Sequence, residues 1–169
     1  MRILFLTHRH SDLTIGGLAE FLMLLPRYLI PCGIESYIYT QASAKNVTEL
    51  QGPFILSNEA KHYCGPFLKP SWLPRSHELK PLLELCLAEK IDLVHAQGTY
   101  RAGYMAYALH KKMNLPYILT SHSDILTSNS ARIQRRSILK RCATVLKHAA
   151  FVTHLTPQMA NASHAIYNT

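Results

Sequence analysis

Short apolar runs alternate with longer segments of helical periodicity along most of the chain, and this alternation restricts the folds that the chain can adopt. The runs have the length and composition of buried strands, and they occupy residues 3–7, 34–40, 91–95, 117–120 and 150–153. Strands that alternate with helices favour parallel pairing, because each helix carries the chain back to the same end of the sheet. The sequence therefore predicts an α/β fold with a Rossmann-like, open and mostly parallel sheet that has helices on both faces.

The helices are predicted from apolar residues that recur at every third or fourth position. The first such stripe consists of Leu18, Phe21, Leu22, Leu25 and Leu29. Pro26 lies within it and is expected to kink the helix. Further stripes lie within residues 79–86, 102–113 and 138–149. A last helix should begin after Thr156, because threonine is a good N-cap and a proline follows it.

The segment from residue 41 to residue 74 has the weakest pattern. Residues 54–56 are apolar enough to form a third strand. Residues 59–74 contain three prolines and the only tryptophan, Trp72, and they show no periodicity. We expect a loop there, and long loops in compact domains are often functional.

Length and composition favour one compact cytoplasmic domain. The 169 residues contain no repeat and no linker, so we expect a single domain over residues 1–169. No apolar run approaches the roughly 20 residues that span a bilayer, and the apolar start has no cleavage site for a signal peptidase. The four cysteines form no C-x-x-C pair, which favours buried free thiols in a reducing compartment.

The first candidate site is the loop that follows the first strand. In an open parallel sheet, ligands bind beyond the carboxyl ends of the strands. Gly16 and Gly17 would let a phosphate or a sugar hydroxyl approach the backbone at a helix N-terminus, although they also suit a simple strand-to-helix turn. His8 and His10 could bind a metal ion, but no third ligand is in register, and we predict no metal site.

Two later loops place polar residues at the same edge of the predicted sheet. Gln97 and Gly98 follow one strand, and His122, Ser123 and Asp124 follow the next. His122 with Asp124 suggests acid–base or charge-orienting chemistry. A histidine at a strand end also occurs as a hydrogen-bonded structural residue, and the spacing alone leaves both readings open.

The chain has a formal net charge of +8 with histidines neutral, which suits an anionic partner. Six cations lie along the helix predicted at 138–149 and just before it, namely Arg132, Arg135, Arg136, Lys140, Arg141 and Lys147. This basic face is either solvated or docks on anionic lipid headgroups, where each cation adds about 1 kcal/mol. Nucleic acid is not expected as a partner, because no nucleic-acid-binding motif accompanies these residues.

Three motifs, taken in order, resemble those of a known family. The first is the opening strand that leads to Gly16-Gly17 and a helix. Residues 91–98 (IDLVHAQG) follow a D-hydrophobic-hydrophobic-H-A-H-G pattern, with Gln97 in place of the second histidine. Residues 115–122 (LPYILTSH) follow P-hydrophobic-hydrophobic-T-x-H-[GD], with Ser123 where glycine or aspartate is usual. The chain thus resembles the N-terminal, acceptor-side domain of GT-B glycosyltransferases of family 4.

The resemblance implies an enzyme that transfers a sugar from a nucleotide-sugar donor to an acceptor with retained configuration. The nucleotide-sugar is a co-substrate, and no cofactor is implied. By resemblance, Gly16 and Gly17 lie beside the donor phosphates and the acceptor, and His122 is the catalytic residue near the transferred sugar. The cleft would also be lined by His8, His10, Gln97, Gly98, Ser123 and Asp124.

The same resemblance implies a missing half. Members of the family carry a second, C-terminal domain that holds the nucleotide-sugar, and we expect this chain to lack it and to be inactive alone. Either a C-terminal domain or a partner subunit would complete the enzyme. The basic helix suggests a lipid-linked or envelope-glycan acceptor at the inner face of the membrane. The alternatives are a non-catalytic acceptor- or membrane-binding subunit of a split transferase, and an unrelated flavodoxin-like domain for a nucleotide or phosphate.

Overall fold

The computed structural model describes residues 1–7, 17–43, 51–55, 60–67, 76–122 and 136–167. The strands in these ranges are β1 (Arg2–Leu6), β2 (Glu35–Ser43), β3 (Gln51–Ile55), β4 (Lys61–Phe67), β5 (Leu93–Gln97), β6 (Tyr117–Ser121) and β7 (Phe151–His154). The helices are α1 (Gly17–Leu29), α2 (Ser76–Ala88), α3 (Arg101–Met113), α4 (Arg136–His148) and α5 (Pro157–Tyr167), with a short 3₁₀ turn at Ile30–Cys32. Strands and helices alternate along the chain, as the sequence predicts, except that β2, β3 and β4 follow one another with no helix among the described residues between them.

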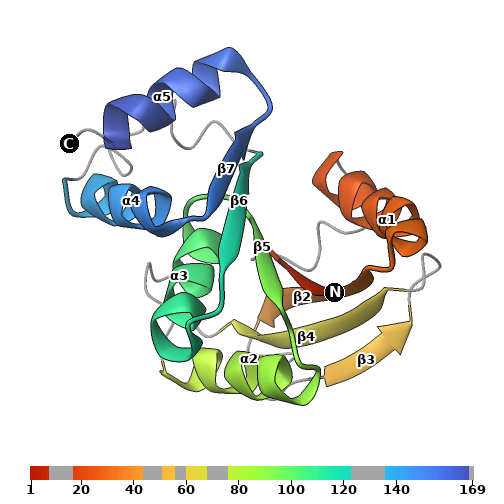
Figure 1. The fold of residues 1–169 in the computed structure, drawn as a ribbon. Coiled ribbons are helices and arrows are strands. Elements are labelled where there is room, and N and C mark those ends of the chain that lie inside the picture. The colour runs from red at the N-terminus through yellow and green to blue at the C-terminus, as the bar shows by residue number, and fades with distance from the viewer. Residues whose placement is uncertain (8–16, 44–50, 56–59, 68–75, 123–135, 168–169) are drawn as a thin grey trace.

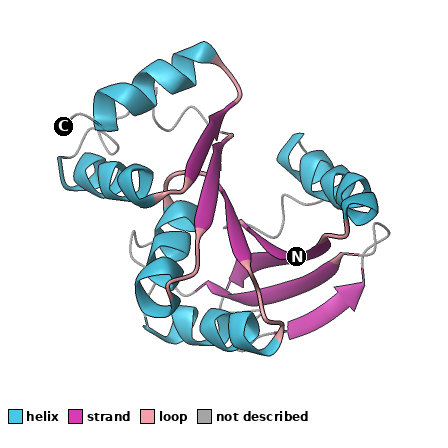
Figure 2. Cartoon of the chain, viewed as in Figure 1, coloured by secondary structure: helices cyan, strands magenta, loops and turns pink. Residues whose placement is uncertain are grey.

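The strands form one sheet in the order β3-β4-β2-β1-β5-β6-β7 (Figures 1 and 2). Neighbouring strands are parallel except for β3, which pairs antiparallel with β4 at the edge of the sheet. Without β3, the order is that of the doubly wound Rossmann fold, in which strand order reverses between β1 and β5. The predicted fold class is confirmed.

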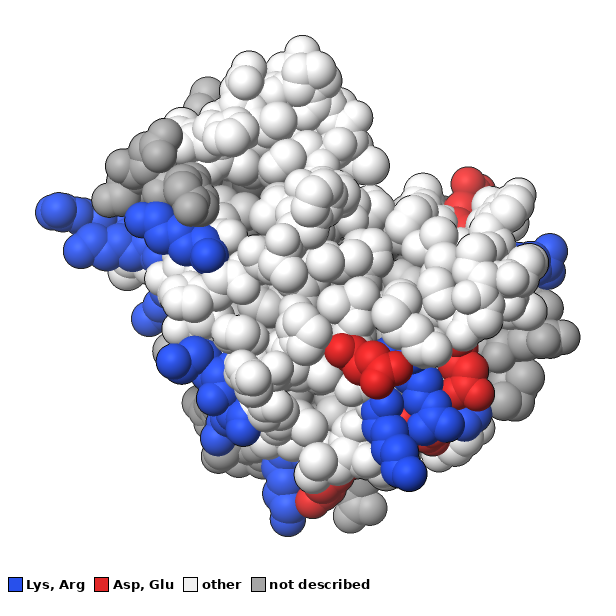
Figure 3. Space-filling model, in the orientation of Figure 1, with Lys and Arg blue, Asp and Glu red and all other residues white. Residues whose placement is uncertain are grey.

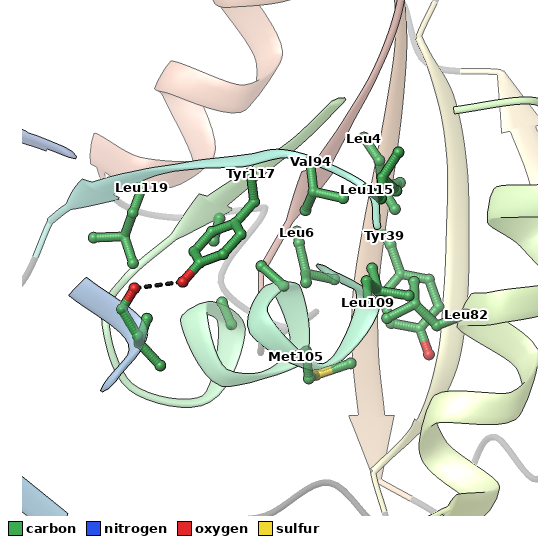
Figure 4. Close-up of a cluster of buried hydrophobic side chains, with 14 of the residues drawn as sticks. Leu4, Leu6, Tyr39, Leu82, Val94, Met105, Leu109, Leu115, Tyr117 and Leu119 are labelled. Atoms are coloured by element: carbon green, nitrogen blue, oxygen red, sulfur yellow. Dashed lines mark hydrogen bonds between the residues drawn. The ribbon is translucent and has the colours of Figure 1, made fainter. Parts of the chain in front are cut away.

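Each face of the sheet has its own hydrophobic core. Helix α1 lies on one side, while α2 and α3 lie on the other (Figure 1). On the α1 side, Phe5 and Ile38 pack with Leu22. On the opposite side, buried residues of the sheet such as Leu4 and Tyr117 pack against α2, α3 and α4 (Figure 4). The alternation of side chains along a strand explains this division, because successive residues point to opposite faces.

The loop expected at residues 59–74 is wrong for Lys61–Phe67, which form strand β4. Residues 61–67 form a strand that pairs parallel with β2 along its whole length. Its side chains contact β2 closely: Thr40 Oγ1 lies 2.8 Å from His62 Nε2. A Cβ at Gly65 would lie only 1.9 Å from Tyr39 Oη, so glycine leaves the space that this tyrosine needs. These partners come from a strand about 25 residues earlier, which local periodicity cannot reveal.

Two smaller expectations also change. The strand expected at 54–56 is β3, and it lies at the antiparallel edge of the sheet. The strand expected at 91–95 begins and ends two residues later, at Leu93–Gln97. Helix α1 extends through Pro26 to Leu29, over the whole predicted stripe, and the kink at Pro26 stays a prediction.

The predicted N-cap of the last helix is confirmed. The Thr156 side chain accepts a hydrogen bond from the backbone N–H of Met159 at 3.3 Å, which caps α5. All four cysteines are free; Cys64, Cys86 and Cys142 are buried, whereas Cys32 is exposed. Among the described residues, no helix is both long enough and apolar enough to cross a membrane.

Candidate functional site

Gln97 and His122 meet at the carboxyl edge of the sheet. Gln97 is the last residue of β5, and His122 directly follows β6, its parallel neighbour. The Gln97 Oε1 atom lies 2.5 Å from His122 Nε2. Gln97 is buried and His122 is partly exposed. The pair lies at the carboxyl edge of the sheet, which is the edge where ligands bind in such folds. The structure thus brings together two residues that the sequence placed in one cleft.

Helix α1 approaches the same pair from the other side of the strand-order reversal. The rings of Phe21 and His122 have centroids 5.2 Å apart and are tilted to one another. Phe21 lies about one turn after Gly17, the first residue of α1, so the N-terminal turn of this helix is close to His122. Gly17 is exposed, and a Cβ there would meet no atom of the described residues within 4 Å. The N-terminus of α1 suits the approach of a polar ligand.

His95 extends the polar cluster along the α1 face of the sheet. Its Nε2 atom lies 2.7 Å from Thr120 Oγ1, which in turn lies 2.6 Å from Thr153 Oγ1. Burial lowers the pKa of His95 to about 4, and the nearby His122 contributes to this shift as a smaller cause. Burial also lowers the pKa of His122. Both imidazoles are therefore neutral near pH 7.

Gly98 forms the turn between β5 and α3. Its φ of 122° lies in a region that L side chains rarely adopt. The Gly98 carbonyl accepts a hydrogen bond from the backbone N–H of Gly103 at 2.9 Å. Gly103 also needs to be glycine, since a Cβ there would lie 2.8 Å from Val145 Cγ1. The two glycines therefore allow the close packing of the β5–α3 turn and the first turn of α3.

A buried ion pair holds the start of α3. The Arg101 guanidinium pairs with Glu78 of α2, and its Nε donates to Gln41 Oε1 at 2.8 Å. The Arg101 and Glu78 side chains are only 3% and 1% exposed, so the pair is desolvated. Gln41 also donates to the Pro66 carbonyl at 3.1 Å. This network joins α2, α3, β2 and β4 behind the β5–α3 turn.

Sequence analysis did not single out Phe21, Arg101, Glu78 or Gln41 for the site. Phe21 belongs to a stripe that predicts only a core face, and its contact with His122 depends on how α1 crosses the sheet. Arg101 and Glu78 are 23 residues apart and belong to different helices. One signal was available: an arginine directly after a Gly-containing turn, at the first position of an apolar helix, has to find a partner if it is buried.

Several predicted site residues lie outside the described residues. These are His8, His10, Gly16, Ser123 and Asp124, together with Arg132 and Arg135 of the basic face. The predicted pairing of His122 with Asp124 therefore stays a prediction. Within the described ranges, no group of three or more His, Cys, Asp or Glu side chains is arranged to hold a metal ion.

Strand order, the turn at Gly98 and the Gln97–His122 pair define a Rossmann-like α/β domain with a polar pair at the carboxyl edge of its sheet, beside the strand-order reversal. The model of a known family, Glycosyltransferase Family 4, matches residues 15–168. The chain therefore belongs to glycosyltransferase family 4, as its three motifs indicate. A search of curated proteins found no match.

Solved structures give the same picture of the fold. A Listeria monocytogenes protein assigned as a UDP-N-acetylglucosamine 2-epimerase matches with a TM-score of 0.60 at 13% identity, over 99% of this chain and 43% of the other. The UDP-GlcNAc 2-epimerase of Methanocaldococcus jannaschii matches with a TM-score of 0.56 at 12% identity, over 98% of this chain and 42% of the other. The chain spans less than half the length of these structures, and its fold is one half of a GT-B fold.

Proposed function

We propose that this chain is the acceptor-side half of a retaining glycosyltransferase, which transfers a sugar from a nucleotide-sugar to an acceptor. The complete enzyme needs a donor-binding half, supplied by a C-terminal domain or by a partner subunit. In this proposal His122 contacts the transferred sugar as the catalytic residue. Gln97, Gly98 and Gly17 line the cleft, together with His8, His10, Gly16, Ser123 and Asp124. The proposal requires neither a metal ion nor a cofactor.

The observation that carries the proposal is the contact between Gln97 and His122 at the carboxyl ends of β5 and β6, beside the strand-order reversal. The chain belongs to glycosyltransferase family 4. His122 stands at the histidine position of one motif by which the chain resembles this family, and Gln97 replaces the second histidine of another. The N-terminal turn of α1 lies close by and adds a positive dipole end that favours anionic phosphates. A nucleotide-sugar has both a phosphate and sugar hydroxyls, so one ligand can meet both features.

The two structural neighbours support the ligand class. Both are named for a reaction on UDP-N-acetylglucosamine, which is a nucleotide-sugar. Each of those chains is more than twice as long as the part that this chain matches. This length supports the need for a second half in the complete transferase.

The proposal is tested by His122→Ala in the complete enzyme, with transfer of radiolabelled sugar as the measurement. Removing a group that contacts the reacting sugar should lower kcat by about 100-fold or more. His148→Ala is the matched control, because His148 is an exposed histidine at the C-terminal end of α4, at the opposite edge of the sheet. Turnover within about twofold of wild type for His122→Ala would remove His122 from the mechanism.

A second proposal concerns the basic face of α4. The apolar side of this helix is buried through residues such as Ile138, Cys142 and Val145. Arg136, Lys140 and Lys147 are exposed on the other side, and Figure 3 shows Lys and Arg side chains gathered over α4. We propose that this face rests on anionic lipid at the inner, cytoplasmic face of the membrane, next to a lipid-linked or envelope-glycan acceptor.

Vesicle binding tests the membrane proposal. Binding to phosphatidylglycerol vesicles should fall at least about fivefold in Lys140→Glu and should weaken as salt rises. Arg27→Glu carries the same charge change on α1, on the other face of the sheet, and should bind as wild type does. Equal losses of vesicle binding in both variants would show that only the net charge matters. That result would contradict the proposal that the basic face of α4 binds the membrane.

The strand order does not favour the alternative of a flavodoxin-like domain. That fold places its strands in the order 2-1-3-4-5. Here the parallel strands follow the order 3-2-1-4-5-6, and the family match covers nearly the whole chain. A non-catalytic role of the chain within a split transferase remains compatible with the same cleft, and the activity of His122→Ala distinguishes it from catalysis.

A further inference from the structure

Gln97 occupies the position at which the family pattern has a second histidine, and its contacts decide which proton the His122 ring carries. The Gln97 side chain has two different ends, an amide NH₂ that only donates hydrogen bonds and a carbonyl oxygen that only accepts them. The NH₂ end lies 3.4 Å from the backbone carbonyl of His95, which can only accept. The carbonyl end is therefore the one that faces His122, as the 2.5 Å contact from Oε1 to Nε2 shows.

An acceptor opposite Nε2 requires that Nε2 carry a proton. Gln97 is only 2% exposed and lies in a strand, and a reversed amide would place its oxygen opposite the His95 carbonyl oxygen, an acceptor facing an acceptor. His122 is partly buried, and burial favours its neutral form. Among the described residues, the titratable neighbour is His95, which is itself neutral near pH 7. A neutral ring protonated at Nε2 carries its lone pair on Nδ1.

We propose that Gln97 is a positioning residue, which fixes His122 as the neutral Nε2–H tautomer so that Nδ1 is a hydrogen-bond acceptor. A ligand group that meets Nδ1 has to donate a hydrogen bond, as a sugar hydroxyl does and a fully ionised phosphate oxygen does not. This assignment of the ligand group rests on the proposed function, whereas the tautomer does not. His122 then binds and orients a hydroxyl, and it does not supply a proton to the leaving phosphate.

The residue at position 97 should thus determine which nitrogen atoms of the His122 ring carry a proton. Histidine at this position can either donate or accept, so it leaves the tautomer of residue 122 open. Glutamate at position 97 would place a carboxylate against Nε2 and stabilise the charged imidazolium, in which both nitrogens donate. Methionine at position 97 keeps the length and burial of the side chain and removes both hydrogen bonds.

Nitrogen-15 NMR of the imidazole rings tests the proposal on the full chain, with the His122 signal assigned by its loss in His122→Asn. At pH 7.5, we expect a protonated Nε2 and an unprotonated Nδ1, with the Nε2 proton protected from exchange with water. Gln97→Met should lose that protection. Gln97→Glu should raise the pH at which His122 titrates by about one to two units. The His148 signal serves as the internal control and should not change.

Two results would overturn the proposal: a proton on Nδ1 of His122 in the wild-type chain, or an unchanged His122 titration in Gln97→Glu. If Gln97→Glu fails to fold, the exchange rate of the Nε2 proton in Gln97→Met decides, because an unchanged rate would also overturn the proposal. Sugar transfer is measured separately. Loss of the transferase function would leave the tautomer result standing, and a Nδ1–H tautomer would leave the transferase function standing.

Discussion

At the scale of single residues, burial keeps the histidines around the cleft neutral. Burial lowers the pKa of His122 and of His154, and it lowers the pKa of His95 to about 4. His95 shows the physical reason most clearly, because its Nε2 atom bonds to the Thr120 hydroxyl instead of a carboxylate that could stabilise a charge. The folded chain therefore resists protonation at positions where the unfolded chain accepts it.

The first prediction is a loss of stability in mild acid. Between about pH 6.5 and pH 4, the unfolded state protonates His95 and the folded state does not, so the free energy of unfolding falls as the pH falls. The contribution of neutral His95 to the free energy of unfolding is fully present above about pH 6.5. Its loss on acidification should lower that free energy by about 2 to 3 kcal/mol. Urea unfolding at a series of pH values measures it. His95→Gln should flatten this part of the curve, and an unflattened curve would contradict the lowered pKa of His95.

The second prediction concerns the backbone of Gly98. Because its φ of 122° is unfavourable for any residue with a Cβ, Gly98→Ala should destabilise the fold by about 1 to 3 kcal/mol, measured by thermal unfolding. Gly17→Ala is the matched comparison, since a Cβ there meets nothing within 4 Å, and it should change stability by less than about 0.5 kcal/mol. Similar stability of the two variants would contradict the assigned conformation of the turn.

At the scale of elements, local patterns predicted the helices and most strands, and failed where the stabilising contacts are distant in sequence. The stripe from Leu18 to Leu29 predicts α1 because its own spacing defines a buried face. Strand β4 has no such signal: His62 depends on Thr40, and Gly65 depends on Tyr39. The prolines nearby, which usually mark loops, strengthened the wrong interpretation.

The third prediction compares two ion pairs on one helix. Glu78 pairs with Arg101 in the interior, whereas Glu84 lies 3.8 Å from Lys80 at the surface of the same α2. Glu78→Gln removes the carboxylate that pairs with the buried guanidinium and should cost about 3 to 5 kcal/mol. Glu84→Gln should cost less than about 0.5 kcal/mol. Chemical denaturation measures both, and a small loss in Glu78→Gln would show that the guanidinium finds another partner or water.

At the scale of the whole molecule, the order of motifs predicted the edge of the sheet that carries the site. The carboxyl ends of parallel strands lie on one edge, so loops after successive strands had to come together, as Gln97 and His122 do. Sequence could not predict the contact of Phe21 with His122 or the network around Arg101, because both depend on how helices cross the sheet. The chain covers less than half of the length of its two structural neighbours.

The most direct test of the central claim is a sugar-transfer assay of residues 1–169 alone and of the same chain joined to, or mixed with, its donor-binding half. We predict no measurable transfer by the chain alone, and transfer with retained anomeric configuration once the donor-binding half is present. Transfer by the chain alone, or an inverted configuration in the completed enzyme, would contradict the claim that this chain is the acceptor-side half of a retaining glycosyltransferase.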